Sequence, residues 1–241
     1  MDVSVNFSRN KRPLYLQIKN ILKDRILHGV YPIGTNIPSE TQLENEFNVS
    51  KITVRNAIKE LAQEGYLEPS SGKGTKVIRN TSASKLSKWK RFTEILVEEG
   101  HKIQKQLLQA EVVRNEEGTE PYQLFGEHCL RIERLYHLND VPYIHYTHYL
   151  TMQMANIELS DLNAQSLYGL LEEQDISLEK HRDEFAVGTA PSHVEKILHV
   201  KEGTPLLKRL RYSYDERGNL IEYNKGYYNT EMQNYVVNYD V

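Results

Sequence analysis

The sequence predicts an α+β protein of two domains, and three observations support this. In the first 80 of the 241 residues, apolar side chains recur at helical spacing in three segments, and a glycine-rich turn follows them. Residues 80–85 are small and polar, as in a linker. Beyond them, extended segments alternate with helical ones, which is typical of an antiparallel sheet with helices. We therefore assign residues 1–79 and 86–241 to separate domains.

The first helix is expected to begin at Pro13. Pro13 suits the first turn, where a backbone N–H has no intrahelical partner, and Gly29 suits a C-terminal stop. The apolar positions follow the spacing of one helix face: Leu14, Ile18, Ile21, Leu22 and Ile26.

Two shorter helices and a hairpin follow. Ser39 predicts the start of the second helix, because Gln42 completes a capping box three residues later. Ser50 predicts the start of the third helix. Residues 66–69 and 75–78 are expected to pair as a hairpin around a glycine-containing turn. Three short helices with such a hairpin form a winged helix-turn-helix, in which the third helix enters the DNA major groove.

The expected DNA contacts lie at the start of the third helix, on the second helix and at the hairpin tip. A hydroxyl cap at a helix N-terminus holds phosphate, and lysine or arginine donates to guanine. The candidate residues are Thr41, Ser50, Lys51, Thr53, Arg55, Asn56, Gly72 and Lys73. Each alone could be an ordinary solvated position, but together they gather where this architecture meets DNA.

The charge distribution favours an anionic partner for the first domain. The chain has a formal net charge of −3, yet residues 1–80 carry 12 lysines and arginines against 8 aspartates and glutamates. The remaining residues carry 18 against 25. A basic end on an acidic body is typical of a protein that presents this end to nucleic acid.

Residues 13–78 resemble the DNA-binding domain of the GntR family of bacterial regulators. The matches include residues 13–18, 37–40, 49–55 and 72–75. The resemblance implies that the candidates above contact operator DNA. The family usually has arginine at the position of Thr41 and often at the position of Lys51. Lysine cannot make the two-pronged hydrogen bond to guanine that arginine makes. We therefore expect an operator preference that differs from that of relatives, with Arg55 keeping its family role.

The second domain is expected to contain two hairpins and three helices. Extended runs at 130–138 and 142–150 flank Asn139 and Asp140, and runs at 206–214 and 220–228 flank a second turn. Helices are expected at residues 89–99, 166–174 and 192–199, the last with a capping box between Ser192 and Glu195.

Residues 86–240 resemble, more loosely, the UTRA effector-binding domain of the HutC subfamily, which is related in fold to chorismate lyase. The resemblance implies a small anionic metabolite, such as a sugar phosphate, as effector. The residues assigned to its anion are Lys90, Arg91, Phe92, Arg134 and Ser166, and those assigned to the rest of it are Tyr146, Glu222 and Tyr228. Parity supports part of this assignment, because Glu222 and Tyr228 share one strand face and Arg134 shares a face with apolar residues.

Relatives often have small hydroxyl residues where Lys90 and Arg91 stand, and an acidic residue where Tyr146 stands. These departures indicate a different anion, so the effector stays unnamed. The alternative is that the residues are structural, with Arg134 in an ion pair with a glutamate.

Other chemistry is less well supported. His137, His145 and His148 match no metal-ligand motif, so we expect no metal and no cofactor. The second domain could be a small-molecule enzyme, but only Glu222 with Arg134 stands out as an acid/base pair. The single Cys129 and the lack of an apolar run of about 18 residues favour a cytoplasmic protein without membrane segments.

The sequence therefore predicts a non-enzymatic, cytoplasmic homodimer that binds palindromic double-stranded operator DNA. We expect a transcriptional repressor whose DNA affinity falls when the anionic metabolite binds the C-terminal domain.

Overall fold

The computed structural model describes residues 13–70, 72–81, 92–155, 157, 161–162 and 166–237. The chain forms two compact units. The first extends to Ile103 and includes Ser166 and Val236, and the second comprises Gln104–Asn163 and Leu167–Tyr235. Residues 92–103 thus cluster with the first unit, beyond the boundary expected at residue 79. Of the expected linker, 82–85 lies outside the described residues.

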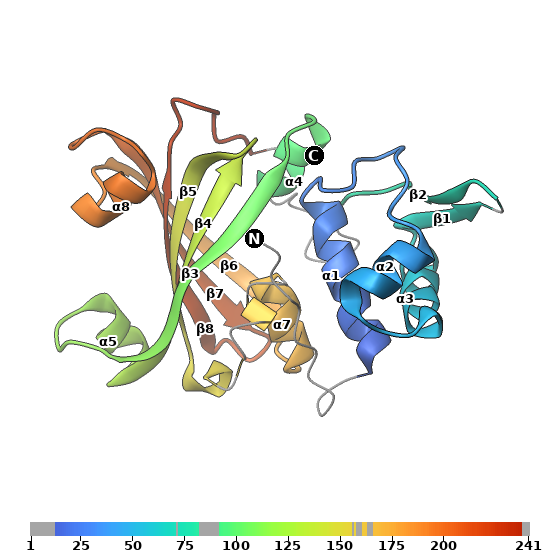
Figure 1. The fold of residues 1–241 in the computed structure, drawn as a ribbon. Helices are drawn as coiled ribbons and strands as arrows, with labels where there is room; N and C mark the ends of the chain where they lie inside the picture. Colours follow the sequence, from blue (N-terminus) through green and yellow to red (C-terminus); the bar gives the residue numbers. More distant parts are fainter. Residues whose placement is uncertain are drawn as a thin grey trace. The chain divides into compact units, whose positions relative to one another are not determined.

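The first unit contains the expected three helices and hairpin. They are α1 (Leu14–Leu27), α2 (Glu40–Phe47), α3 (Lys51–Gln63), β1 (Leu67–Ser70) and β2 (Gly74–Val77), followed by α4 (Phe92–Glu98) (Figure 1). The apolar stripes of the three helices meet in one core that includes Leu22, Leu43 and Leu61. Complete burial of each such side chain contributes roughly 1.5–3 kcal/mol.

Local signals set the ends of these helices. The expected capping box at α2 is confirmed, since Ser39 N donates to Gln42 Oε1 at 2.8 Å and Gln42 N donates to Ser39 Oγ at 3.3 Å. Asn48, in the left-handed conformation with φ +49°, ends α2, and Ser50 caps α3.

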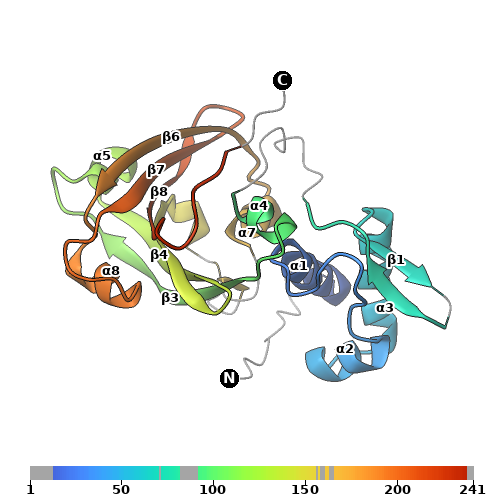
Figure 2. The same ribbon diagram turned by 90° about the horizontal axis from the view of Figure 1, so that it is seen from above.

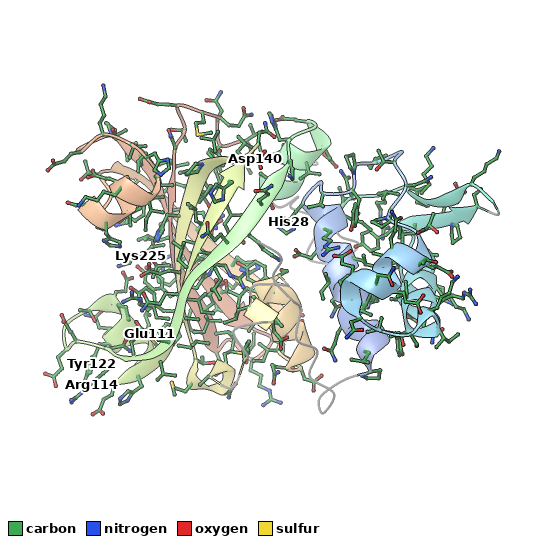
Figure 3. All side chains as sticks on the ribbon, viewed as in Figure 1. His28, Glu111, Arg114, Tyr122, Asp140 and Lys225 are labelled. Carbon is green, nitrogen blue, oxygen red and sulfur yellow. The ribbon has the colours of Figure 1, made fainter. Side chains whose placement is uncertain are left out.

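The second unit is built on a six-stranded antiparallel sheet with strand order β3-β4-β5-β8-β7-β6. The strands are β3 (Ile103–Arg114), β4 (His128–Leu138), β5 (Val141–Leu150), β6 (Leu178–Gly188), β7 (Leu206–Asp215) and β8 (Leu220–Tyr228). Both expected hairpins are present as β4–β5, with Asp140 in its turn (Figure 3), and β7–β8. They meet at the centre of the sheet, where β5 pairs with β8.

The helices of this unit lie on both faces of the sheet. Seen from above, the sheet is curved, with α7 (Leu167–Glu173) on its inner side (Figure 2). We call this the concave face. On the opposite, convex face lie α5 (Glu120–Phe125) and α8 (Ser192–Ile197), and Lys225 of β8 projects there (Figure 3). No helix among the described residues is long and apolar enough to cross a membrane.

One expected detail of this unit is wrong. The capping box at α8 does not form, because Pro191 is the N-cap and has no side-chain donor or acceptor. The carboxylate of Glu195 instead accepts a hydrogen bond from Gly203 N at 2.8 Å. Glu195 therefore anchors the loop that precedes β7.

Candidate DNA-binding surface and effector site

The start of α3 brings several of the candidate DNA contacts together. Ser50 Oγ accepts from Thr53 N at 3.4 Å and lies 2.8 Å from Thr53 Oγ1, which fixes both hydroxyls at the helix N-terminus. Lys51 and Asn56 are exposed on the same helix, and Thr41 is exposed at the start of α2. Their polar groups are thus accessible, as DNA contact requires.

Arg55 is held by a carboxylate from the neighbouring helix. Its Nε donates to Glu40 Oε1 at 3.2 Å and its Nη2 donates to Glu40 Oε2 at 2.9 Å. The hydrogen bond from Arg55 lowers the pKa of Glu40, so the carboxylate stays charged. This two-pronged contact orients an otherwise exposed guanidinium.

Asn36, which was not predicted from the sequence, holds the hairpin tip in place. Asn36 Nδ2 donates to Lys73 O at 2.9 Å, and Asn36 also pairs with Lys76 in a β-bridge. A Cβ at Gly74 would lie 2.9 Å from Asn36 Nδ2, so this approach needs glycine. Gly72 adopts φ +74° at the tip, and both Gly72 and Lys73 are exposed.

The concave face of the sheet carries a set of polar side chains that are buried apart from the partly buried Arg211, and we call this set the polar layer. The strand registers align Arg134 with Tyr146, Gly226 and Arg209, and align His148 with Asn224 in the next row. The polar layer consists of Arg134, Tyr146, His148, Arg209, Arg211, Ser213, Glu222, Asn224 and Tyr228. Arg134 is 1% exposed, and Glu222 and Asn224 are fully buried. Such burial is costly for charged groups unless they are paired or hydrogen-bonded.

Glu222 is the most thoroughly hydrogen-bonded member of the polar layer. Its Oε1 accepts from His148 Nδ1 at 2.6 Å and from Asn224 Nδ2 at 3.0 Å. Its Oε2 accepts from Ser213 Oγ at 2.9 Å and from Tyr168 OH at 3.2 Å. Burial alone would raise the pKa of Glu222, but these hydrogen bonds, led by that from His148, hold it at about 2.

The three arginines of the polar layer have different partners. Arg211 donates to both oxygens of Asp183, at 2.7 and 2.6 Å, and is neutralised. Arg209 lies 5.5 Å from the ring centroids of both Tyr146 and Tyr228. The described residues place no carboxylate within 4.0 Å of the guanidinium of Arg209 or Arg134. The alternative of an Arg134–glutamate ion pair therefore does not describe this part of the chain.

The two tyrosines beside Arg209 form a pair of their own. Their hydroxyl oxygens are 2.7 Å apart, and their rings meet edge to face with centroids 5.7 Å apart. Burial raises the pKa of Tyr146 to about 12, so its hydroxyl stays protonated. A Cβ at Gly226 would lie 2.7 Å from Tyr146 Cε1 and 2.9 Å from Tyr228 Cε2. Because Gly226 has no side chain, the rings of Tyr146 and Tyr228 can pack closely against β8 at this position.

Four polar atoms of the polar layer are buried with no hydrogen-bond partner among the described residues. They are Arg134 Nε, Arg209 Nε, His148 Nε2 and Asn224 Oδ1. Buried polar atoms in native proteins nearly always have a partner, whether protein, water or ligand. The two arginine atoms are donors that suit an anion, whereas Asn224 Oδ1 is an acceptor.

The structure brings together half of the residues assigned to the effector. Arg134, Tyr146, Glu222 and Tyr228 all lie in the polar layer. Phe92, the first residue of α4, and Ser166, before α7, cluster with the other unit, and Lys90 and Arg91 lie outside the described residues. Their role in the effector site remains a prediction.

Five members of the polar layer were not predicted from the sequence: His148, Arg209, Arg211, Ser213 and Asn224. The period of two along a strand was a usable signal for Asn224, two residues from Glu222. His148 was considered only as a metal ligand. The described residues contain no group of three His, Cys, Asp or Glu side chains that could hold a metal. His145 packs near Glu133 on the convex face, whereas His148 lies on the concave one.

Comparison with protein families agrees with this architecture. Residues 14–77 match the family described as bacterial regulatory proteins, gntR family, and residues 98–233 match the UTRA domain. The transcriptional repressor NagR of Bacillus subtilis is 26% identical over 93% of each chain. The mannosyl-D-glycerate transport/metabolism system repressor MngR of Escherichia coli is 25% identical, over 91% of this chain and 93% of its own.

Solved structures show the same fold. PhnF from Mycobacterium smegmatis superposes with a TM-score of 0.51 at 22% identity, over 89% of this chain and 93% of its own. The possible transcriptional regulator YydK from Bacillus subtilis gives 0.52 at 18% identity, over 94% and 99%. The winged helix-turn-helix and the antiparallel α+β domain expected from the sequence are thereby confirmed. This chain belongs to the GntR family of bacterial DNA-binding transcriptional regulators, with a C-terminal UTRA domain as expected for its HutC subfamily.

Proposed function

We propose that the chain is a transcriptional repressor that releases its operator when a small, hydroxylated, anionic metabolite binds the polar layer. The observation that carries this proposal is the burial of Arg134 and Arg209 without a carboxylate partner among the described residues. Relatives named as repressors support the direction of the regulation, among them MngR and a probable fructoselysine utilization operon repressor of Escherichia coli.

The energetics of burial favour an anion at this place. A buried charge whose partner is missing typically destabilises a protein by several kcal/mol. Arg134 has a backbone carbonyl, that of Leu162, and Arg209 has tyrosine rings and the hydroxyl of Tyr235. These neutral partners compensate the two charges only in part. A bound phosphate or carboxylate that accepts hydrogen bonds from the Nε–H groups of Arg134 and Arg209 would therefore be strongly stabilised.

The first unit supplies the DNA-binding half of the function. A homodimer would present two α3 helices to a palindromic operator with half-sites about 34 Å apart. The proposed contacts are Thr41, Ser50, Lys51, Thr53, Arg55, Asn56, Gly72 and Lys73. We place the protein in the cytoplasm, where operator DNA and metabolite meet.

The hydrogen bonding of Glu222 favours regulation over catalysis. A general acid works best with a pKa near the operating pH. Glu222 has a pKa of about 2 and is ionised at neutral pH. Its two oxygens already accept four hydrogen bonds, so it is also poorly placed to abstract a proton.

A thermal-shift screen tests this proposal. The full-length protein would be heated with phosphorylated sugars, sugar acids and their neutral parent sugars. We expect an anionic sugar to raise the melting temperature and its neutral parent to leave it unchanged. Stabilisation by neutral sugars alone, or conversion of the bound compound into a product, would overturn the proposal. Sedimentation with an operator duplex would test the dimer.

A further inference from the structure

We propose that Glu222 is a positioning residue that fixes His148 and Asn224 as a pair of hydrogen-bond acceptors, and that this pair selects effectors with two neighbouring donor groups such as adjacent hydroxyls. The inference rests on the proposed effector function of the polar layer. It assigns the recognition of uncharged groups on the effector to His148 and Asn224, and gives Glu222 an indirect role.

The Glu222 carboxylate can accept only a limited number of hydrogen bonds. An ionised carboxylate is only an acceptor, with about four lone-pair sites. The four donors described above, from His148, Asn224, Ser213 and Tyr168, occupy that number of sites. Glu222 therefore has little capacity left for an effector, although it lies in the middle of the polar layer.

The contact with Glu222 determines the tautomer of His148. Because the Glu222 carboxylate only accepts, the 2.6 Å contact requires the proton on His148 Nδ1. In the neutral ring, Nε2 then carries a lone pair. Burial lowers the pKa of His148 more than Glu222 raises it, and the charges of Arg134 and Arg209 lower it further. Nε2 is thus a buried acceptor without a partner among the described residues.

The same carboxylate orients the side-chain amide of Asn224. Its Nδ2 donates to Glu222 Oε1 at 3.0 Å, which fixes the orientation of the amide group. Oδ1 is consequently turned away as an acceptor, and it too is buried without a partner among the described residues. One carboxylate oxygen therefore sets the direction of both neighbouring side chains.

His148 and Asn224 are neighbours on the sheet. His148 and Asn224 are directly opposite each other on β5 and β8 and lie on one face, a position that brings Cβ atoms to about 4.5–5.5 Å. Acceptors on two directly opposed side chains suit two neighbouring donor groups of one small molecule. The same row continues to Arg211 and Asp183, which neutralise each other, and Arg134 and Arg209 lie in the next row. Here the cationic Arg134 and Arg209 outnumber the anionic Glu222, so hydroxyls fit the surroundings of the two acceptors better than an ammonium group does.

The tautomer can be tested without any effector. Nitrogen-15 NMR of histidine-labelled full-length protein at neutral pH reads which ring nitrogen carries the proton, with the His148 signal assigned from a His148→Asn variant. We expect Nδ1 to be protonated and Nε2 bare. The Glu222→Met variant should lose the preference of His148 for the tautomer protonated on Nδ1. The separate Glu222→Gln variant should keep this preference, because its side chain still has a carbonyl acceptor. A proton on Nε2 in the wild type would overturn the inference.

The selectivity is tested with hexose 6-phosphates and their monodeoxy derivatives. We expect at least one monodeoxy derivative to bind the wild type roughly tenfold or more weakly than the parent sugar phosphate does. In His148→Leu or Asn224→Leu the loss of the same hydroxyl should change affinity less than threefold. Equal losses in wild type and variants would overturn the inference. Failure of every sugar phosphate to bind would instead contradict the proposed effector class, while the NMR result still decides the role of Glu222.

Discussion

Arg55 of α3 donates two hydrogen bonds to the carboxylate of Glu40 at the start of α2, at 3.2 and 2.9 Å. The pair joins the two helices that a helix-turn-helix presents to DNA. A DNA phosphate or base that contacts Arg55 would therefore compete with Glu40 for the guanidinium group. Glu40 would therefore influence the strength of the proposed Arg55–DNA contact without touching DNA itself.

Arg55→Ala is expected to weaken operator binding by about 1–3 kcal/mol, because a direct arginine contact is lost. The side chain is exposed, so the melting temperature should change little. Fluorescence anisotropy with an operator duplex measures the effect. Arg182→Ala is the matched control, since Arg182 is an exposed arginine of β6 paired with Glu184. Equal affinities for wild type and Arg55→Ala would remove Arg55 from the DNA-binding surface.

Arg209→Met should abolish effector-induced thermal stabilisation while operator affinity stays near that of the wild type. Methionine retains much of the side-chain volume between Tyr146 and Tyr228 but removes the charge that suits an anion. Arg134→Met should behave in the same way. Differential scanning fluorimetry with the best sugar phosphate is the measurement. A thermal shift of wild-type size in either variant would exclude that arginine from anion binding.

Gly226→Ala should weaken effector binding, because its methyl group would lie 2.7 Å from Tyr146 and force the ring to move. Overpacking of this kind typically also costs 1–3 kcal/mol of stability. Gly188→Ala is the matched control, since a Cβ there meets no heavy atom within 4 Å. Calorimetric titration should give a weaker Kd for the first variant alone. Indistinguishable variants would show that the Tyr146–Tyr228 pair tolerates displacement.

The protein should lose stability as the pH falls from about 6.5 to about 4. His145 is fully buried, and burial lowers its pKa to about 4, against the opposing effect of Glu133 at 3.6 Å. The unfolded chain therefore binds a proton that the folded chain rejects in this range. The loss from this one residue is on the order of 3 kcal/mol at most. His148, whose pKa is also lowered, acts in the same direction.

Urea unfolding at pH 7 and pH 5 checks this prediction. His145→Leu should narrow the difference in unfolding free energy between the two pH values, because leucine has no proton to gain. His128→Leu, at an exposed position on β4, should leave the difference unchanged. The same pH dependence in wild type and His145→Leu would contradict the assignment.

The elements found from the sequence were those with strong local patterns. The three helices of the first unit carry apolar stripes, and α2 and α3 also have serine caps. In the hairpins, β5 and β8 are rich in β-branched and aromatic residues. In contrast, β6 was missed because this edge strand is mostly exposed and charged, from Lys180 to Glu184. In β3 the apolar residues come in adjacent pairs, such as Leu107 and Leu108, which hides the period of two.

The candidate effector site was predicted only in part, because its members come from strands that are distant in sequence. The resemblance to UTRA domains located Arg134 and Glu222, and strand parity explains why each faces the concave side. The row that joins Arg134 to Arg209 depends on the β5–β8 and β7–β8 registers, and β4 and β7 each contain a register shift. Only tertiary pairing reveals that Arg209 has tyrosine rings where an acid would neutralise it.

The most direct test of the account is the operator affinity of the full-length protein with and without the sugar phosphate that stabilises it most. Anisotropy titrations at one fixed salt concentration should show a 5- to 150-fold weaker Kd for operator DNA at saturating effector, equivalent to a coupling free energy of about 1–3 kcal/mol. Arg209→Met should show no such change. An unchanged wild-type Kd, with the ligand demonstrably bound, would contradict the claim that the polar layer controls DNA binding.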